Sequence, residues 1–205
     1  MAARSTTQVQ QVGSTLLLLS VLVGGGFAAH SAVDAAPKCF GKTATIDDHK
    51  GAITGTNGND VIIGDDGDND IDGKGGKDRI CAKGGNDVID ASGKKLSADG
   101  GDGNDEIHGT NKVDTLNGGE GQDVIFAGGG NDAVKGNSGD DELHGGDGDD
   151  ALSGGEGDDQ LFGETGSDSL SGGDGEDDLD GGPDPDFCSQ DNEVLHACDF
   201  ALPLA

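Results

Sequence analysis

Apolar residues recur at every ninth position over most of this chain. The residues on either side of each apolar position are mostly polar, and such alternation is typical of a short strand with one buried face. The pattern therefore predicts one short strand in each of fifteen consecutive frames. The buried column is Ile62, Ile71, Ile80, Ile89, Ala98, Ile107, Leu116, Ile125, Val134, Leu143, Leu152, Leu161, Leu170, Leu179 and Cys188.

Glycine and aspartate also keep constant places within each frame. Residues 145–161 read GGDGDDALSGGEGDDQL, so the unit is G-G-x-G-x-D-x-U-x, where U is the apolar residue at position 8. Glycine at positions 1, 2 and 4 allows tight backbone bends, and we expect positions 7–9 to form the strand. One unit cannot bury its apolar residue alone, so the units must stack, two per 18-residue turn of a flattened coil.

Position 6 forms a second column, made of carboxylates. Aspartate is a hard oxygen ligand of the kind that Ca²⁺ takes, and bent glycine loops can add backbone carbonyls. Thirteen of the fifteen residues in this column are aspartates, and Asn69 and Leu96 interrupt it.

Residues 55–186 resemble the RTX, or haemolysin-type, calcium-binding nonapeptide repeats. The resemblance implies an all-β fold, a parallel β-roll (a right-handed β-helix or solenoid), with calcium between loops that stack on the same edge. By position, the resemblance implies that the ligands are loop carbonyls and the position-6 aspartates. The stronger candidate ligands are Asp87, Asp105, Asp123, Asp132, Asp141, Asp150, Asp159, Asp168 and Asp177, and the weaker ones are Asp60, Asp78, Asp114 and Asp186. Counting well-preserved same-edge pairs predicts about six to nine calcium ions.

One edge of the predicted coil is altered. The frame that starts at residue 91 has Lys94 at position 4, Lys95 at position 5 and Leu96 at position 6, and the next frame on that edge has Lys112 at position 4. One hypothesis is that these ammonium groups replace part of the calcium charge. The alternative is neutral drift in a tolerant repeat.

The composition restricts how this chain folds. Its 205 residues include 41 glycines and no Trp or Tyr, and its net charge is −29. A chain so polar and so charged is not expected to fold unaided. The same charge should repel nucleic acid and anionic lipid and should attract divalent cations.

The chain divides into four predicted segments. Residues 1–36 resemble a secretory signal peptide, because the apolar run at 15–23 is too short to span a bilayer and small residues follow it; the alternative is a buried helix. Residues 37–54 are expected to form a cap of two short strands without metal. Residues 55–189 form the roll, and residues 190–205 form a C-terminal cap or tail.

Four cysteines allow three disulfide pairings, and export favours disulfides over free thiols or a zinc site. We favour Cys39–Cys81, because Cys81 faces outwards at position 9, where the preceding segment can fold back. We favour Cys188–Cys198, because Cys198 can close a hairpin over the open end of the coil.

No catalytic motif accompanies the repeats, so we expect no enzyme. Many relatives in the resembling family are toxins, proteases or lipases, whereas this chain resembles small exported repeat-only proteins of bacteria. The sequence favours a secreted module that folds on binding calcium and has a structural or interaction role at the cell surface or in a matrix. The alternatives are an extracellular calcium buffer without a partner and an accessory fragment of a toxin or hydrolase. No membrane span and no nucleic-acid partner are expected.

Overall fold

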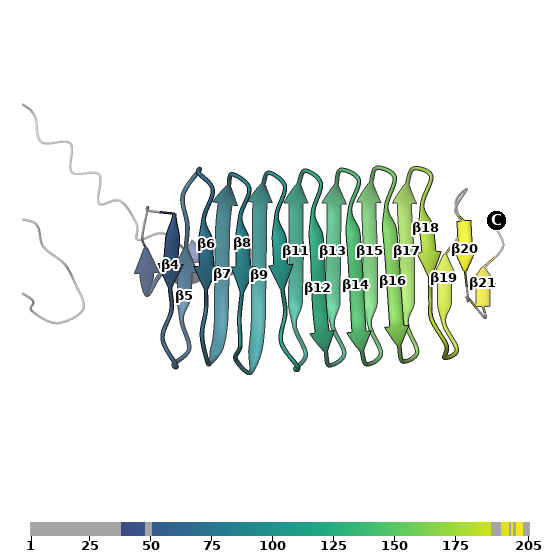
Figure 1. The fold of residues 1–205 in the computed structure, drawn as a ribbon, viewed down its shortest axis with the longest axis horizontal. Coiled ribbons are helices and arrows are strands. Elements are labelled where there is room, and N and C mark those ends of the chain that lie inside the picture. The colour runs from purple at the N-terminus through teal and green to yellow at the C-terminus, as the bar shows by residue number, and fades with distance from the viewer. Residues whose placement is uncertain (1–37, 48–50, 190–193, 197, 199, 203–205) are drawn as a thin grey trace, which may run out of the picture. The chain divides into compact units, whose positions relative to one another are not determined.

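The described residues form two parallel sheets that face each other (Figure 1). The computed structural model describes residues 38–47, 51–189, 194–196, 198 and 200–202, and these contain strands and turns but no helix. The even sheet consists of β4 (Ala52–Thr54), β6 (Asp70–Asp72), β8 (Val88–Asp90), β10 (Glu106–His108), β12 (Val124–Gly129), β14 (Glu142–Asp147), β16 (Gln160–Thr165), β18 (Asp178–Asp180) and β20 (Val194–His196). The odd sheet consists of β3 (Ile46–Asp47), β5 (Val61–Ile63), β7 (Lys77–Gly84), β9 (Lys95–Asp102), β11 (Thr115–Glu120), β13 (Ala133–Ser138), β15 (Ala151–Glu156), β17 (Ser169–Asp174), β19 (Phe187–Ser189) and β21 (Phe200–Leu202).

Successive strands alternate between the two sheets, so each turn of the coil adds one strand to each sheet. Within the repeats, strand residues that pair in parallel lie 18 positions apart, as Leu152 and Leu170 do. This pairing confirms the predicted β-roll and its 18-residue turn. It also places every second frame on the same edge.

The strands of the well-preserved frames are longer than predicted. β15 begins at position 7 of its frame and continues through positions 1–3 of the next, for six residues in all. Along it the buried residues are Leu152 and Gly154, so the glycine at position 1 faces inwards together with the apolar residue. Positions 4–6 alone form the loop. The expectation of three-residue strands was therefore wrong for these frames, because a glycine without a side chain can also continue a buried strand.

The apolar column forms the core between the sheets. Each of its fifteen members is at most 2% exposed, and Ile53 extends the column by one frame in the predicted N-terminal cap. The core is one side chain wide in each sheet. Because nearly every frame buries only one large residue, the stack must be long to be stable.

A second apolar cluster lies at the N-terminal end of the odd sheet. The antiparallel pair β1 (Lys38–Cys39) and β2 (Lys42–Thr43) brings Cys39 against Val61 and Ile63, which are buried although they occupy the outward positions 7 and 9. A disulfide joins Cys39 to Cys81 in the neighbouring strand, as predicted. The N-terminal cap therefore covers the outer surface of this sheet as well as adding the strands β3 and β4.

The C-terminal end differs in one respect from the prediction. Cys188 and Cys198 form the expected disulfide. They do not close a hairpin, because β19 and β21 run parallel, with Cys188 opposite Ala201 and β20 between them in the chain. The chain makes a shortened extra turn instead. The predicted signal peptide lies outside the described residues.

Candidate metal centre

The position-6 side chains stand in two buried rows, one along each edge of the roll. The thirteen aspartates among them are between 1% and 6% exposed. One carboxylate oxygen of each interior member has a fixed partner: Oδ1 of Asp123 accepts the backbone N–H of Asp105 at 2.8 Å, and Oδ1 of Asp141 accepts the N–H of Asp123 at 2.8 Å. This ladder repeats every 18 residues and sets the orientation of every carboxylate.

The second oxygen, Oδ2, is buried without a hydrogen-bond partner in each of the nine stronger candidate ligands. A buried carboxylate oxygen without a donor is costly, so each one needs an explanation. The nine are Asp87, Asp105, Asp123, Asp132, Asp141, Asp150, Asp159, Asp168 and Asp177.

In seven of the nine frames this oxygen lies beside the glycine at position 1, whereas in the frames of Asp87 and Asp132 an alanine holds that position. A Cβ placed on Gly154 would lie 2.1 Å from Oδ2 of Asp159 and 2.7 Å from the carbonyl oxygen of Gly172, in the next turn on the same edge. A Cβ placed on Gly163 would meet Oδ2 of Asp168 and the Gly181 carbonyl oxygen in the same way, each at 2.5 Å. Two acceptors from stacked turns therefore converge where no donor is present, an arrangement that suits a cation with oxygen ligands.

The pKa values of these aspartates also favour a bound cation. Burial, together with the charge of nearby carboxylates and against the opposing effect of a backbone hydrogen bond, raises the pKa of Asp123 and of Asp159 to about 7. Burial likewise raises the pKa to about 6 in Asp87, Asp105, Asp132, Asp141, Asp150 and Asp168. Stacked carboxylates thus resist ionisation unless positive charge is supplied.

Other frames satisfy the carboxylate or replace it. Oδ2 of Asp60 accepts hydrogen bonds from the N–H and hydroxyl of Thr56, at 2.7 and 2.9 Å, and Oδ2 of Asp114 accepts the N–H of Thr110 at 2.6 Å. Asn69 and Leu96 carry no charge. Asp78 is buried with its pKa raised by burial, but it is not among the nine. The threonines were not singled out from the sequence, although their place at position 2 instead of glycine was the available signal.

The lysine hypothesis gains support at one residue. The charge of Lys95 lowers the pKa of Asp114 and of Asp132, although burial has the larger and opposite effect on both. Lys95 therefore acts on two carboxylates of the edge on which frame 91 lacks its own. The replacement of calcium charge by Lys94 and Lys112 stays a prediction.

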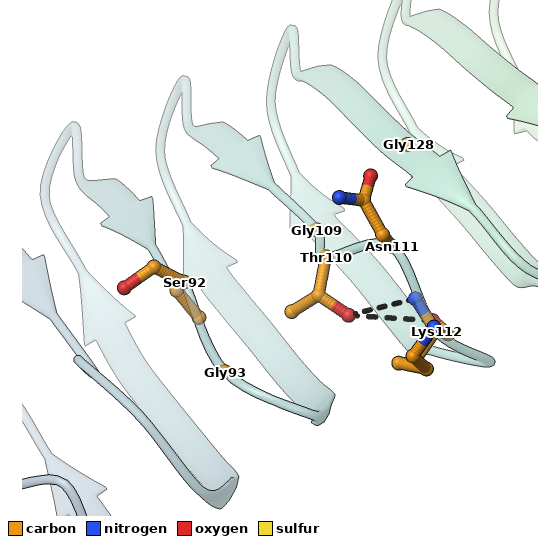
Figure 2. Close-up of a pocket in the computed structure, with 8 residues that line it drawn as sticks. Ser92, Gly93, Gly109, Thr110, Asn111, Lys112 and Gly128 are labelled. Atoms are coloured by element: carbon orange, nitrogen blue, oxygen red, sulfur yellow. Dashed lines mark hydrogen bonds between the residues drawn. The ribbon is translucent and has the colours of Figure 1, made fainter.

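A gap of about 420 Å³ opens on this altered edge. Figure 2 shows it between the loops that carry Ser92 and Gly93 and the loop of Gly109, Thr110, Asn111 and Lys112. The Thr110 hydroxyl is bound within its own loop, to the backbone N–H and carbonyl of Lys112. No carboxylate lines this gap, in contrast to the loops of the preserved frames.

A stack of rings on the outer face of the even sheet was not predicted from the sequence. His108, Phe126, His144 and Phe162 lie on adjacent strands at position 9, with ring centroids 5.3, 4.7 and 4.8 Å apart and interplanar angles of 8–19°. The 18-residue spacing was the signal that could have found them. The His144 ring also contacts Glu142 and Glu164, at 2.9 and 3.1 Å.

No three His, Cys, Asp or Glu side chains gather as one metal cluster within the described ranges. Each convergence of oxygens described above combines one carboxylate with backbone carbonyl oxygen. In the same part of the chain no helix is long and apolar enough to cross a membrane.

Comparison with known proteins adds one result. A family model for an RTX calcium-binding nonapeptide repeat, in four copies, matches residues 54–89, 99–134, 127–161 and 153–188. Together the matches span more than half of the chain. The interval between the first two contains the Leu96 frame, the most altered one. No curated protein matches the chain.

Proposed function

Since the chain belongs to the RTX calcium-binding nonapeptide repeat family, whose repeats bind calcium, we propose that it is an exported, non-enzymatic protein whose roll folds on binding calcium. We propose further that the folded roll serves as an extracellular structural or interaction module. The observation that carries the proposal is the set of nine buried Oδ2 atoms without partners.

The nine aspartates specify where calcium is held. Six lie on one edge, Asp87, Asp105, Asp123, Asp141, Asp159 and Asp177; three lie on the other, Asp132, Asp150 and Asp168. A carbonyl oxygen from the next turn lies close to the carboxylates of Asp105, Asp150, Asp159 and Asp168. With one ion for each of the nine aspartates, nine is the upper end of the expected six to nine ions. Calcium supplies the positive charge that lets neighbouring carboxylates ionise while buried.

Folding and binding are therefore one process for these residues. Without a cation, each additional turn buries carboxylates that either repel one another or must take up protons. When a cation is bound, the same oxygens coordinate it from consecutive turns, and the binding free energy is also folding free energy. Calcium outside cells reaches the range that suits extracellular modules, roughly 10⁻⁴–10⁻³ M dissociation constants, so export is the natural trigger.

The outer faces favour an interaction module over a calcium buffer, which needs no organised surface. On the even sheet, the outward positions carry the ring stack and seven acidic residues: Asp70, Asp72, Asp90, Glu106, Glu142, Asp178 and Asp180. On the odd sheet, Ser, Thr and Ala predominate after β7. Calcium binding thus presents two chemically different flat surfaces. Binding to cell-wall and matrix material, tested with and without calcium, separates the two roles.

The first experiment is a calcium titration of the secreted chain followed by far-UV circular dichroism and by isothermal calorimetry. We expect a cooperative, chelator-reversible gain of β structure and six to nine ions per chain. Mg²⁺ is the matched control, because it prefers a smaller, octahedral site and keeps its water. A chain that is fully β-structured in chelator and binds no calcium would contradict the proposal.

A further inference from the structure

Charge is distributed very unevenly along the chain. Residues 38–113 contain ten Lys and Arg and fifteen Asp and Glu, a net charge of −5. Residues 114–205 contain a single basic residue, Lys135, and twenty-five acidic residues, a net charge of −24. The electrostatic cost of compaction without a cation therefore falls almost entirely on the C-terminal part of the roll.

The first two repeat frames also satisfy their position-6 side chains internally. Oδ2 of Asp60 accepts two hydrogen bonds from Thr56, as described above. Asn69 is neutral, accepts the N–H of Asp65 at 3.0 Å and donates to Oδ1 of Asp65 at 3.1 Å. We call the space beside the position-1 glycine, between the position-6 side chain and the carbonyl of the next turn, the glycine cradle. The Asn69 frame has such a cradle, since a Cβ on Gly64 would lie 2.1 Å from Oδ1 of Asn69 and 2.6 Å from the Ala82 carbonyl oxygen. There the uncharged, hydrogen-bonded amide of Asn69 takes the place of an unpartnered carboxylate.

On the edge that carries Asp60, within the described residues, no position-6 oxygen before Asp132 is both fully buried and without a hydrogen-bond partner. Leu96 is fully buried in place of an aspartate. Both oxygens of Asp114 accept backbone N–H groups, from Leu96 and Thr110, each at 2.6 Å.

Additional packing strengthens the same end. The cluster of Cys39, Val61 and Ile63 gives strands β5 and β7 buried apolar contacts on their outer face. The Cys39–Cys81 disulfide restricts the unfolded chain across 42 residues. Thr45 adds hydrogen bonds through its hydroxyl to both the N–H and the carbonyl of Val61, at 2.8 and 3.2 Å.

We propose that strands β1–β7, the starter segment, fold without calcium and form the end on which the calcium-dependent turns assemble. This inference rests on the proposed function, because it assumes that calcium folds the remainder. The roll then grows from its N-terminal end, one 18-residue turn at a time. Each new turn pairs with an existing strand, so the costly first turn is formed before metal arrives.

The test is hydrogen exchange of the secreted, disulfide-bonded full chain, measured by mass spectrometry in chelator and in saturating calcium. In chelator we expect amides of β5–β7 to exchange at least about tenfold more slowly than those of β15–β17, because the two regions open with different free energies. In calcium both regions should be protected.

The outcomes separate the two proposals. If calcium protects β15–β17 but β5–β7 exchange as fast as β15–β17 in chelator, the starter segment is refuted and the proposed function stands. If calcium protects neither region, or chelator leaves both protected, the proposed function itself fails.

A charge swap tests the cause. Asn69→Asp places a carboxylate in the cradle beside Gly64, and we expect the chelator protection of β5–β7 to fall at least about tenfold and to return with calcium. The matched reverse change, Asp105→Asn, should leave β5–β7 protection in chelator unchanged and remove one bound calcium. Unaltered protection in Asn69→Asp would show that neutrality of this frame is not what frees the starter segment from calcium.

Discussion

The aspartates of this roll share one sequence position but differ in one atomic detail. Oδ1 accepts a backbone N–H in nearly every frame, whereas Oδ2 is either unpartnered, as in Asp123, or bound by a threonine, as in Asp114. The carboxylate is thus structural through one oxygen and available to a cation through the other. Frames in which Oδ2 is available to a cation therefore differ from the others in whether Oδ2 has a hydrogen-bond partner.

Replacing single aspartates tests this distinction. Asp123→Asn keeps the shape but removes a charged oxygen beside Gly118, so we expect one fewer calcium and a several-fold higher calcium midpoint, because a charge-assisted contact contributes roughly 1.5–3 kcal/mol. Asp114→Asn is the control, and it should leave the number of ions unchanged. Both are measured by calcium titration with calorimetry. Equal losses in the two variants would show that the hydrogen-bonding of Oδ2 does not select the sites.

At the scale of the loop, position 4 requires glycine for two reasons. Gly148 has a φ of +135°, and a Cβ there would lie 1.5 Å from the carbonyl oxygen of Gly130 in the previous turn of the same edge. Loops stack through backbone contact, without side chains between them. Gly129, one residue before Gly130, has room for a Cβ, whose nearest neighbour would be 3.7 Å away.

We therefore expect Gly148→Ala to destabilise the calcium-loaded roll by about 2 kcal/mol or more, from backbone strain and overpacking. Gly129→Ala should change the free energy of unfolding by no more than about 0.5 kcal/mol. Urea unfolding in saturating calcium measures both. A neutral Gly148→Ala would mean that neighbouring loops separate easily.

On the outer face of the even sheet, the ring stack joins β10, β12, β14 and β16. Its members pack face to face, so each interior ring contacts two others. Such pairs contribute about 0.5–1.5 kcal/mol each beyond the burial of area. The stack thus links four turns of the coil independently of the metal edges.

Phe126→Ser removes two of these contacts, and we expect a loss of about 1–2 kcal/mol in unfolding free energy. Lys135→Ser, at the same frame position on the odd sheet, is the matched control and should be nearly neutral. Thermal unfolding in saturating calcium is the measurement. If the two variants are equally stable, the rings contribute nothing beyond occupying the surface.

Over the whole roll, the buried carboxylates titrate as a set. Burial raises the pKa of Asp123 and Asp159 to about 7 and that of six others to about 6, far above the usual aspartate value. For a group whose pKa is higher in the folded state, protonation stabilises that state. The stabilisation is complete below about pH 4 and is lost as pH rises through about 6–7.

In chelator, we therefore expect β structure to increase as pH falls from about 8 to about 5, because protons neutralise the carboxylates that calcium otherwise neutralises. In the presence of calcium the effect reverses, and the calcium midpoint should rise over the same range, since the ligands must be deprotonated. Far-UV circular dichroism follows both. A chelated chain with the same spectrum at both pH values would contradict the raised pKa values.

The nine-residue period, together with the resemblance to the RTX repeats, predicted the architecture. The period placed Leu152 and its counterparts in the core, set the 18-residue turn and divided the frames between two edges, because a repeated unit that buries one residue has few ways to stack. The resemblance indicated the nine aspartates whose Oδ2 is buried without a partner. Both disulfides followed from where Cys81 and Cys188 stand in the frame.

Other features depend on groups that meet only in three dimensions. The capping of Asp60 and Asp114 by threonines, the burial of Val61 and Ile63 under β1 and β2, and the reach of Lys95 to Asp114 and Asp132 are set by side-chain contacts across turns. The same is true of the ring stack and of the parallel β21. A periodic sequence determines which residues share a column, because pairing follows the period. Whether a polar atom in that column finds a donor depends on the irregular residues beside it, and only the folded structure shows which of them lie within hydrogen-bonding distance.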